Sequence, residues 1–255
     1  MAPMKEFPEL GLVDWIDSHH LPDGVRVGFT SRVGGTSAGD HASLNLAFHS
    51  GDDAHDVSAN RDLLQSHLGG ELAWMAQVHG AKVARARDAR LGKRGYLGVG
   101  EADAIVVESG ESAAVMVADC VPLILVAADG SRGAAVHVGR AGFDLAIARA
   151  VVEELDRTDM IAFLGPSICG QCYEVGEALA KQIDARWPGT AVPTRWGTAG
   201  LDIAGGLERQ LRDLGVRNIH RSQLCTYESE EYYSHRRATH EGKETGRFIG
   251  MVQIT

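Results

Sequence analysis

The sequence lacks an excess of positive charge and any long basic run. It carries 25 lysines and arginines against 34 aspartates and glutamates, a formal net charge of -9. Such a surface repels the phosphate backbone of DNA or RNA on average. We therefore expect no nucleic-acid partner. Nothing in the sequence fixes an oligomeric state.

Long apolar runs and the marks of a secretion signal are also lacking. The most apolar stretch, residues 113–128, is interrupted by Asp119 and Pro122 and is shorter than the ~20 residues of a membrane span. The N-terminus has acidic residues and prolines where a signal peptide would have a basic start and an apolar run. These features predict a cytoplasmic protein without membrane association.

Cysteine is scarce, with four residues at positions 120, 169, 172 and 225. In a cytoplasmic chain they are expected to be reduced thiols or ligands and not disulfides. "CGQC" at 169–172 has CxxC spacing, but the sequence has no second CxxC, and a redox motif should open a helix after a strand in a thioredoxin-like βαβ unit. We interpret it as a turn into a helix that starts near Glu174.

The remaining composition, with 44% hydrophobic residues, 23% charged residues and 31 glycines, is that of a globular protein. Neither a repeat nor a linker divides the chain, which predicts one domain over residues 1–255. Apolar runs and period-2 alternation predict strands before residue 140, at 25–30, 72–78, 81–86, 102–107, 113–118, 122–128 and 132–138. Apolar residues three and four apart predict helices at 56–68, 143–156, 174–187 and 201–215, the first capped by Asp56. This order predicts a layered α+β fold with mixed β-sheets and flanking helices.

A charged Asp119 and the thiol of Cys120 stand inside the apolar stretch "ADCVPLILV". An aspartate there costs free energy unless something pairs with it. His79 follows another predicted strand in "QVHG", and His137 ends a third before a glycine-rich turn. Two histidines and one cysteine suit Zn²⁺ with a fourth position open to water or substrate, and they could also bind Cu²⁺.

Other interpretations of these residues remain open. Cys120 could be a small buried hydrophobic residue beside ordinary histidines. It could also be a nucleophile with His137 as its base and Asp119 orienting the site. Arg32 and His49, in the glycine-rich segment that follows the first long strand, could contact a ligand or lie in a surface loop.

Several motifs in order resemble the YfiH-type family, also called laccase-domain or multicopper polyphenol oxidase proteins. They are "TSRVGGTSAGDHASLNLAFHSGDD", "VSANRDLL", "QVHG", "ADCVPLIL", "HVGRAG", "GPSICGQCYEVG", "CTYESEEYYSHRR" and "TGRFIGMV". The resemblance implies a single-domain α+β fold and a zinc site at His79, Cys120 and His137. It further implies phosphorolysis of adenosine, inosine, guanosine and methylthioadenosine together with deamination of adenosine. The family has also been labelled a phenol oxidase and linked to peptidoglycan editing.

This chain departs from the family pattern after His137. Where many members have HAGWRG, this chain has "HVGRAG", so its arginine, Arg140, falls one place earlier.

Residue types favour zinc chemistry over multicopper oxidation. A multicopper oxidase needs roughly ten histidine ligands, whereas this chain has 11 histidines and no His-x-His. Zinc-bound water, with its pKa lowered toward ~7, can attack C6 of adenosine.

Asp119 is the candidate for proton transfer, provided that the chain bends near it. A phosphate would need arginines, and the candidates are Arg61, Arg140, Arg236 and Arg247. The competing functions are a metal-free Cys–His hydrolase acting on an amide and a non-enzymatic binding protein.

Overall fold

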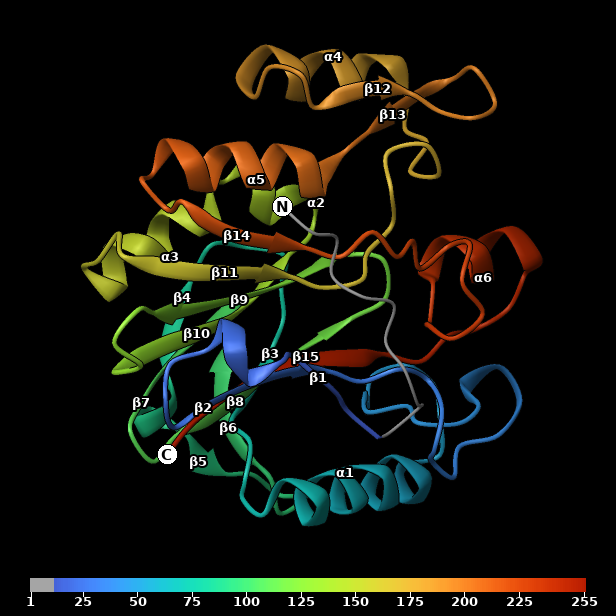
Figure 1. Ribbon diagram of the computed structural model, residues 1–255. Coiled ribbons are helices and arrows are strands. Elements are labelled where there is room, and N and C mark those ends of the chain that lie inside the picture. The colour runs from blue at the N-terminus through green and yellow to red at the C-terminus, as the bar shows by residue number, and fades with distance from the viewer. Residues whose placement is uncertain (1–11) are drawn as a thin grey trace.

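The apolar run "VPLILVA" forms a central strand of a six-stranded mixed sheet. The computed structural model describes residues 12–255 (Figure 1). In spatial order the strands are β14 (Asn218–Arg221), β11 (Met160–Leu164), β9 (Val121–Ala127), β10 (Arg132–Val138), β7 (Ala104–Glu108) and β4 (Val83–Arg85). Strands β11, β9, β10 and β7 pair antiparallel in succession, while the edge strands β14 and β4 pair in parallel with β11 and β7.

A second, four-stranded sheet packs against one face of the first. Its strands are β1 (Asp14–Trp15), β2 (Val25–Phe29), β15 (Phe248–Ile254) and β8 (Ser112–Val117). Smaller sheets are formed by β3 (Trp74–Ala76), β6 (Leu97–Glu101) and β5 (Arg90–Leu91), and by β12 (Ala191–Pro193) with β13 (Ala199–Leu201).

Side chains of β9 fill two cores, one on each face of the six-stranded sheet. Val121, Leu123 and Leu125 point into the core shared with the helices. Ile124 and Val126 point into the core between the two sheets. A strand buried on both faces has a nearly continuous apolar sequence, which explains "VPLILVA".

Helices cover the outer faces of the two sheets, giving a helix–sheet–sheet–helix stack (Figure 1). The helices are α1 (Ala54–Leu68), α2 (Arg140–Asp144), α3 (Ile147–Leu155), α4 (Glu177–Arg186), α5 (Ile203–Asp213) and α6 (His235–Glu241). Of these, α2, α3 and α5 pack on the six-stranded sheet, and α1 packs its Leu64 and Leu68 against the four-stranded sheet. Among residues 12–255 no helix has the length and apolar character to cross a bilayer. The predicted layered α+β fold is confirmed.

Helix boundaries differ from the prediction at three places. Asp53, and not Asp56, caps α1, because its carboxylate accepts a hydrogen bond from the His55 N–H at 2.8 Å. The helix predicted over 143–156 is broken into α2 and α3 at Ala146, whose φ of +56° is left-handed. The helix predicted from residue 174 begins at Glu177.

Candidate active site

One end of the central sheet brings Cys120 beside His137. Strand β9 begins at Val121 opposite Val138, and Pro122 lies opposite His137 on β10. Cys120 therefore stands at the entrance to β9, after the turn that follows β8, and next to the end of β10. The antiparallel register of two buried strands fixes this proximity.

His79 completes a cluster with these two residues. It lies in the loop after β3 with a left-handed φ of +58°, a strained conformation for a residue with a side chain. Its ring centroid is 4.6 Å from that of His137, with the ring planes at 81°. Ligand atoms of His79, Cys120 and His137 all lie within 4.8 Å of one another, so the group could hold a metal ion.

A fully buried carboxylate, Asp103, supports both histidines. Its oxygens accept the backbone N–H groups of His79 at 2.9 Å and Gly80 at 2.7 Å, which hold the His79 loop. The same carboxylate lies 2.8 Å from Nδ1 of His137. Bound in this way, His137 carries its proton on Nδ1 and leaves Nε2 free for a metal or a proton.

Gly139 makes room for the cluster. A Cβ atom added there would lie 2.8 Å from Cδ2 of His79 and 3.1 Å from Sγ of Cys120. Real Cβ atoms essentially never lie closer than 3.0 Å to another heavy atom, so a side chain at this position would force His79 to move. Glycine is required here for close approach.

The cluster favours a charged thiolate–imidazolium pair when no metal is bound. Burial alone would raise the pKa of the Cys120 thiol, but the positive charge and hydrogen bonds of His137 and His79 lower it below the ordinary cysteine value. Burial alone would lower the pKa of His137, but the Cys120 thiolate and Asp103 raise it. A thiolate at Cys120 is the form that binds metals or attacks substrates.

Asp119 sits in the turn between β8 and β9 with a φ of +85°. This left-handed residue supplies the bend that a role for Asp119 beside Cys120 requires. One carboxylate oxygen accepts the Thr226 hydroxyl at 2.7 Å, and the other accepts the backbone N–H of Arg236 at 2.6 Å. Asp119 thereby ties the start of α6 to the cluster.

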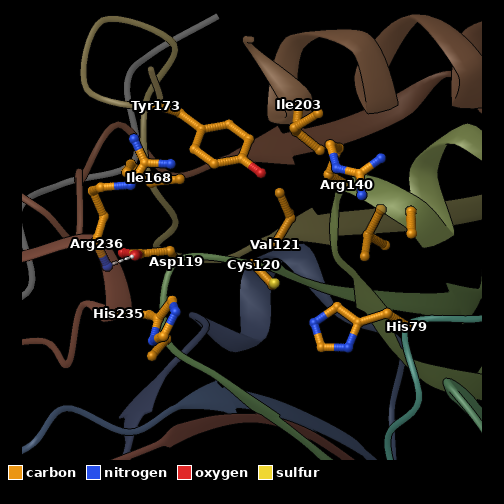
Figure 2. A pocket seen from close by; sticks show the side chains of 13 residues that line it. His79, Asp119, Cys120, Val121, Arg140, Ile168, Tyr173, Ile203, His235 and Arg236 are labelled. Atoms are coloured by element: carbon orange, nitrogen blue, oxygen red, sulfur yellow. Dashed lines mark hydrogen bonds between the residues drawn. The ribbon is translucent and has the colours of Figure 1, made fainter. Parts of the chain in front are cut away.

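A pocket of about 320 Å³ opens directly over the cluster (Figure 2). Its wall includes His79, Asp119, Cys120, Val121, Arg140, Ile168, Tyr173, Ile203, His235 and Arg236. Figure 2 shows the Tyr173 ring and the Arg140 and Arg236 side chains around the same opening. Arg236 also donates to the Glu174 carbonyl at 2.8 Å and lies 5.1 Å from the Tyr173 ring centroid. The pocket thus combines a metal-binding group, two cations and an aromatic ring.

The other predicted ligand-binding residues lie elsewhere or are engaged. Arg61 lines a separate pocket of about 440 Å³, where it stacks over Trp74 at 3.7 Å. His49 lines that pocket too. Burial lowers the pKa of Arg247, and the charges of Cys120 and Asp119 offset part of that effect. The Arg247 guanidinium donates to the Thr245 and Gly246 carbonyls. Nε of Arg32 donates a hydrogen bond to the Ala42 carbonyl at 2.6 Å, which holds the loop that contains both residues.

A family described as multi-copper polyphenol oxidoreductase laccase matches residues 26–255 of the chain. The chain belongs to this family. The predicted resemblance to laccase-domain proteins is confirmed.

A named relative and solved structures are similar to this chain over most of its length. A Streptomyces coelicolor protein named purine nucleoside phosphorylase is 40% identical over 241 residues, which cover 91% of this chain and 96% of that protein. A Neisseria meningitidis crystal structure matches with a TM-score of 0.85 at 27% identity, covering 96% of this chain and 99% of that one. A Bacillus licheniformis hypothetical protein, YfiH, shares the fold with a TM-score of 0.80 at 24% identity, over 91% of this chain and 93% of that one.

Sequence reasoning missed Asp103, Tyr173 and His235. Asp103 directly precedes β7 and lies across from His137 at the end of β10, because Ala104 pairs with Val136. Knowing that β7 pairs with β10, and in which register, would have revealed it. Tyr173 and His235 reach the pocket from a loop and from the start of α6, and no periodic pattern in the sequence signals such positions.

Proposed function

We propose that this chain is a zinc-dependent purine nucleoside phosphorylase that also deaminates adenosine. The observation that carries the proposal is the ligand cluster of His79, Cys120 and His137 at the base of a pocket walled by arginines and a tyrosine. The name of the Streptomyces relative supports the nucleoside class. The proposed substrates are adenosine, inosine, guanosine and methylthioadenosine with phosphate, used in the cytoplasm by a single domain spanning residues 1–255.

The donor set fits zinc. Asp103 orients His137 so that Nε2 is free, and Gly139 keeps side chains out of the space between the ligand atoms. Two imidazoles and a thiolate leave one position open in a tetrahedral site. When bound, zinc would supply a Lewis acid and a water whose pKa is lowered toward ~7. Multicopper oxidation fits less well, because it needs roughly ten histidine ligands and the described residues bring only two histidines together in such a group.

The residues around the pocket can bind both substrates of phosphorolysis. Arg140 and Arg236 place two cations on the pocket wall, where a phosphate would be bound, and Arg247 is the third arginine we assign to phosphate binding. Tyr173 offers an aromatic face to a purine ring. In the reaction a phosphate oxygen bonds to C1′ while the C1′–N9 bond breaks, and the purine takes up a proton. Asp119 and His235 are the titratable wall residues we assign to proton transfer, with the carboxylate of Asp119 also fixing the Arg236 backbone.

Arg61 is proposed as a more distant contributor to anion binding. It is buried, and its guanidinium donates to the Leu46 carbonyl at 2.9 Å and contacts the sulfur of Met116. Burial lowers the pKa of Arg61 to about 9. Its position in the neighbouring pocket makes it a candidate for one end of a larger substrate and not for the reacting phosphate.

Product analysis tests the proposal. Wild-type protein is incubated with adenosine, with and without phosphate, and the products are separated by liquid chromatography and mass spectrometry. We expect adenine and ribose 1-phosphate only with phosphate. Ammonia should form in either case, with inosine as the other product without phosphate and with part of that inosine cleaved to hypoxanthine when phosphate is present. Cys120→Ala should lose both reactions while keeping its circular dichroism spectrum. An unchanged rate in a folded Cys120→Ala protein would overturn the zinc-centred proposal.

A second candidate function is favoured by the consecutive placement of the Cys120, His137 and Asp103 side chains. A thiolate, an imidazole and an orienting carboxylate 2.8 Å from Nδ1 have the arrangement of a nucleophile, a base and its support. A metal-free Cys–His hydrolase acting on an amide would use it, in keeping with a role in peptidoglycan editing. Full activity on an amide substrate after chelator treatment, abolished by alkylation of Cys120, would favour this candidate.

A further inference from the structure

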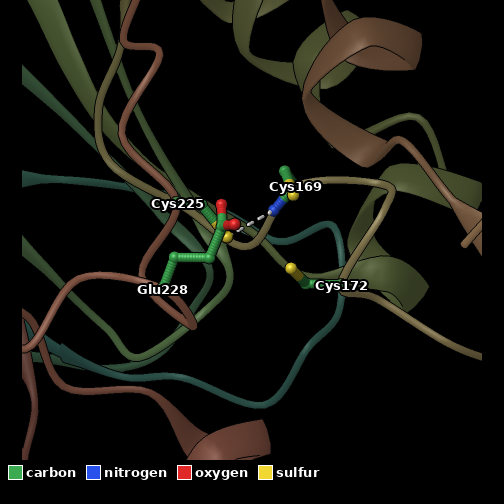
Figure 3. A group of neighbouring side chains, drawn as sticks. All are labelled: Cys169, Cys172, Cys225 and Glu228. Carbon is green, nitrogen blue, oxygen red and sulfur yellow. Dashed lines mark hydrogen bonds between the residues drawn. The ribbon is translucent and has the colours of Figure 1, made fainter. Parts of the chain in front are cut away.

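Three cysteines and a glutamate meet in a second cluster away from the Cys120 pocket (Figure 3). The residues are Cys169, Cys172, Cys225 and Glu228, and their ligand atoms all lie within 4.8 Å of one another. All three thiols are free. The sequence predicted only a turn for "CGQC" because no second CxxC exists. In the fold, Cys225 and Glu228 provide a CxxE pair that faces it.

Both pairs are held on the same kind of turn. The Cys172 N–H donates to the Cys169 carbonyl at 3.0 Å, and the Glu228 N–H donates to the Cys225 carbonyl at 3.1 Å. Each turn thus directs its first and fourth side chains to one side. Paired turns with CxxC spacing are the arrangement of structural zinc sites.

Backbone contacts hold the two turns against each other without a metal. Ser167 and Cys225 form a parallel bridge, and the Thr226 N–H donates to the Ser167 carbonyl at 3.2 Å. The Cys169 N–H points at Sγ of Cys225 at 3.4 Å. An N–H aimed at sulfur can stabilise the negative charge of a thiolate that binds a metal.

The cluster has the size and burial of a closed metal site. A zinc–sulfur bond of ~2.3 Å puts tetrahedral ligands ~3.8 Å apart, within the 4.8 Å that bounds these ligand atoms. Cys172 and Cys225 are buried, whereas Glu228 lies at the surface and gives access from solvent. Arg195 donates to one oxygen of Glu228 at 2.5 Å, which offsets part of the negative charge of four anionic ligands and leaves the second oxygen for a metal.

We propose that Cys169, Cys172, Cys225 and Glu228 bind a structural Zn²⁺ ion that is distinct from the metal of the Cys120 pocket. Soft thiolate ligands in a tetrahedral set select zinc over harder cations. The site would stabilise two walls of the pocket. Ile168 and Tyr173 flank the CxxC turn and line the pocket, and Thr226 follows Cys225 and binds Asp119.

Metal counting with paired variants tests this site. Reduced protein purified without added metal is analysed by plasma mass spectrometry as wild type, Cys120→Ala, Cys169→Ser and the double variant. Cys169→Ser is chosen because Cys169 is only partly buried, so the variant should fold. We expect two zinc ions per chain in wild type, one in each single variant and none in the double variant. Because the two single variants empty different sites, failure at Cys120 and failure at Cys169 are distinguishable.

The Cys120→Ala protein then identifies the ligands. Loaded with Co²⁺ in place of zinc, it should show thiolate-to-cobalt charge transfer and the strong visible bands of tetrahedral cobalt. Glu228→Gln in the same background should speed metal loss to a chelator at least about tenfold, because it replaces a charged ligand with a neutral one. Folded Cys120→Ala protein that holds no metal, or that contains a disulfide among the three remaining cysteines, would overturn the proposal.

Discussion

Asp103 connects the two histidines of the pocket through one side chain. Its carboxylate caps the His79 loop through backbone N–H groups and fixes the Nδ1 side of His137. Supporting carboxylates of this kind orient histidine ligands and make them more basic. The metal affinity of the pocket therefore depends on a residue that does not itself point into the pocket.

Asp103→Asn should weaken zinc binding at the Cys120 pocket by roughly 10- to 100-fold. The amide can present only one acceptor oxygen, and its NH₂ group opposes the N–H donors that Asp103 binds. Competition with a chromophoric chelator measures the change. Asp53→Asn, which removes the same charge at the cap of α1, should bind zinc like wild type. Equal zinc affinity in Asp103→Asn and wild type would contradict the role given to Asp103.

Gly139→Ala tests the space between the ligand atoms. The new Cβ would lie 2.8 Å from His79 and 3.1 Å from Cys120, so we expect at least about a tenfold loss of zinc affinity with the fold retained. Gly176→Ala is the matched control, since nothing lies within 4 Å of a Cβ there and the backbone is not left-handed. If both variants keep zinc equally well, the site does not depend on close approach at Gly139.

At the scale of elements, strand register accounts for how the site assembles. Strands β9, β10 and β7 were predictable from their apolar runs, and their antiparallel pairing places Cys120, His137 and Asp103 at one end of the sheet. The sequence signals the strands but not which strands are neighbours, so Asp103 was missed. The proximity of Cys169 and Cys225 was missed for the same reason. Short elements such as β12, β14 and α6 have too few residues for a periodic pattern.

The edge strand β1 carries a carboxyl group that should make stability depend on pH. Burial, followed by the charge of Glu231, raises the pKa of Asp14 to about 6, above its unfolded value near 4. The folded state therefore binds this proton more tightly, and stability is lost as pH rises from about 4 to 6.

Asp14→Asn should thus raise the free energy of unfolding at pH 7.5 by about 1 kcal/mol, allowing for the partial exposure of the group. The gain should fade as the pH falls toward about 4, where both states of wild type bind the proton. Urea unfolding of the two proteins across this range measures the difference. A difference that does not change with pH would show that burial does not perturb Asp14.

At the scale of the whole molecule, the two packed sheets form a rigid base for loops that carry the chemistry. The sequence predicted this layered class because strands cluster before residue 140 and helices follow. It could not predict that β15, at the far end of the chain, inserts between β2 and β8 in the second sheet. That long-range pairing also places Arg247, just before β15, beside Asn45, whose side-chain oxygen accepts the Arg247 N–H at 2.9 Å.

Metal removal should destabilise the whole fold. Ligands that bind only the native state stabilise it by mass action, and both proposed metal sites join segments that are distant in sequence. We expect chelator-treated wild type to melt roughly 5–10 °C lower than the zinc-loaded protein. Cys120→Ala/Cys169→Ser should show no such difference. Differential scanning calorimetry makes the comparison, and an equal melting temperature for loaded and stripped wild type would contradict it.

Zinc in the Cys120 pocket can be located by anomalous diffraction from crystals of wild-type protein, recorded above and below the zinc absorption edge. We expect an anomalous peak that appears only above the edge, within bonding distance of Nε2 of His137, Sγ of Cys120 and a ring nitrogen of His79. A fully ordered pocket without that peak, in crystals grown with zinc and no chelator, would contradict it.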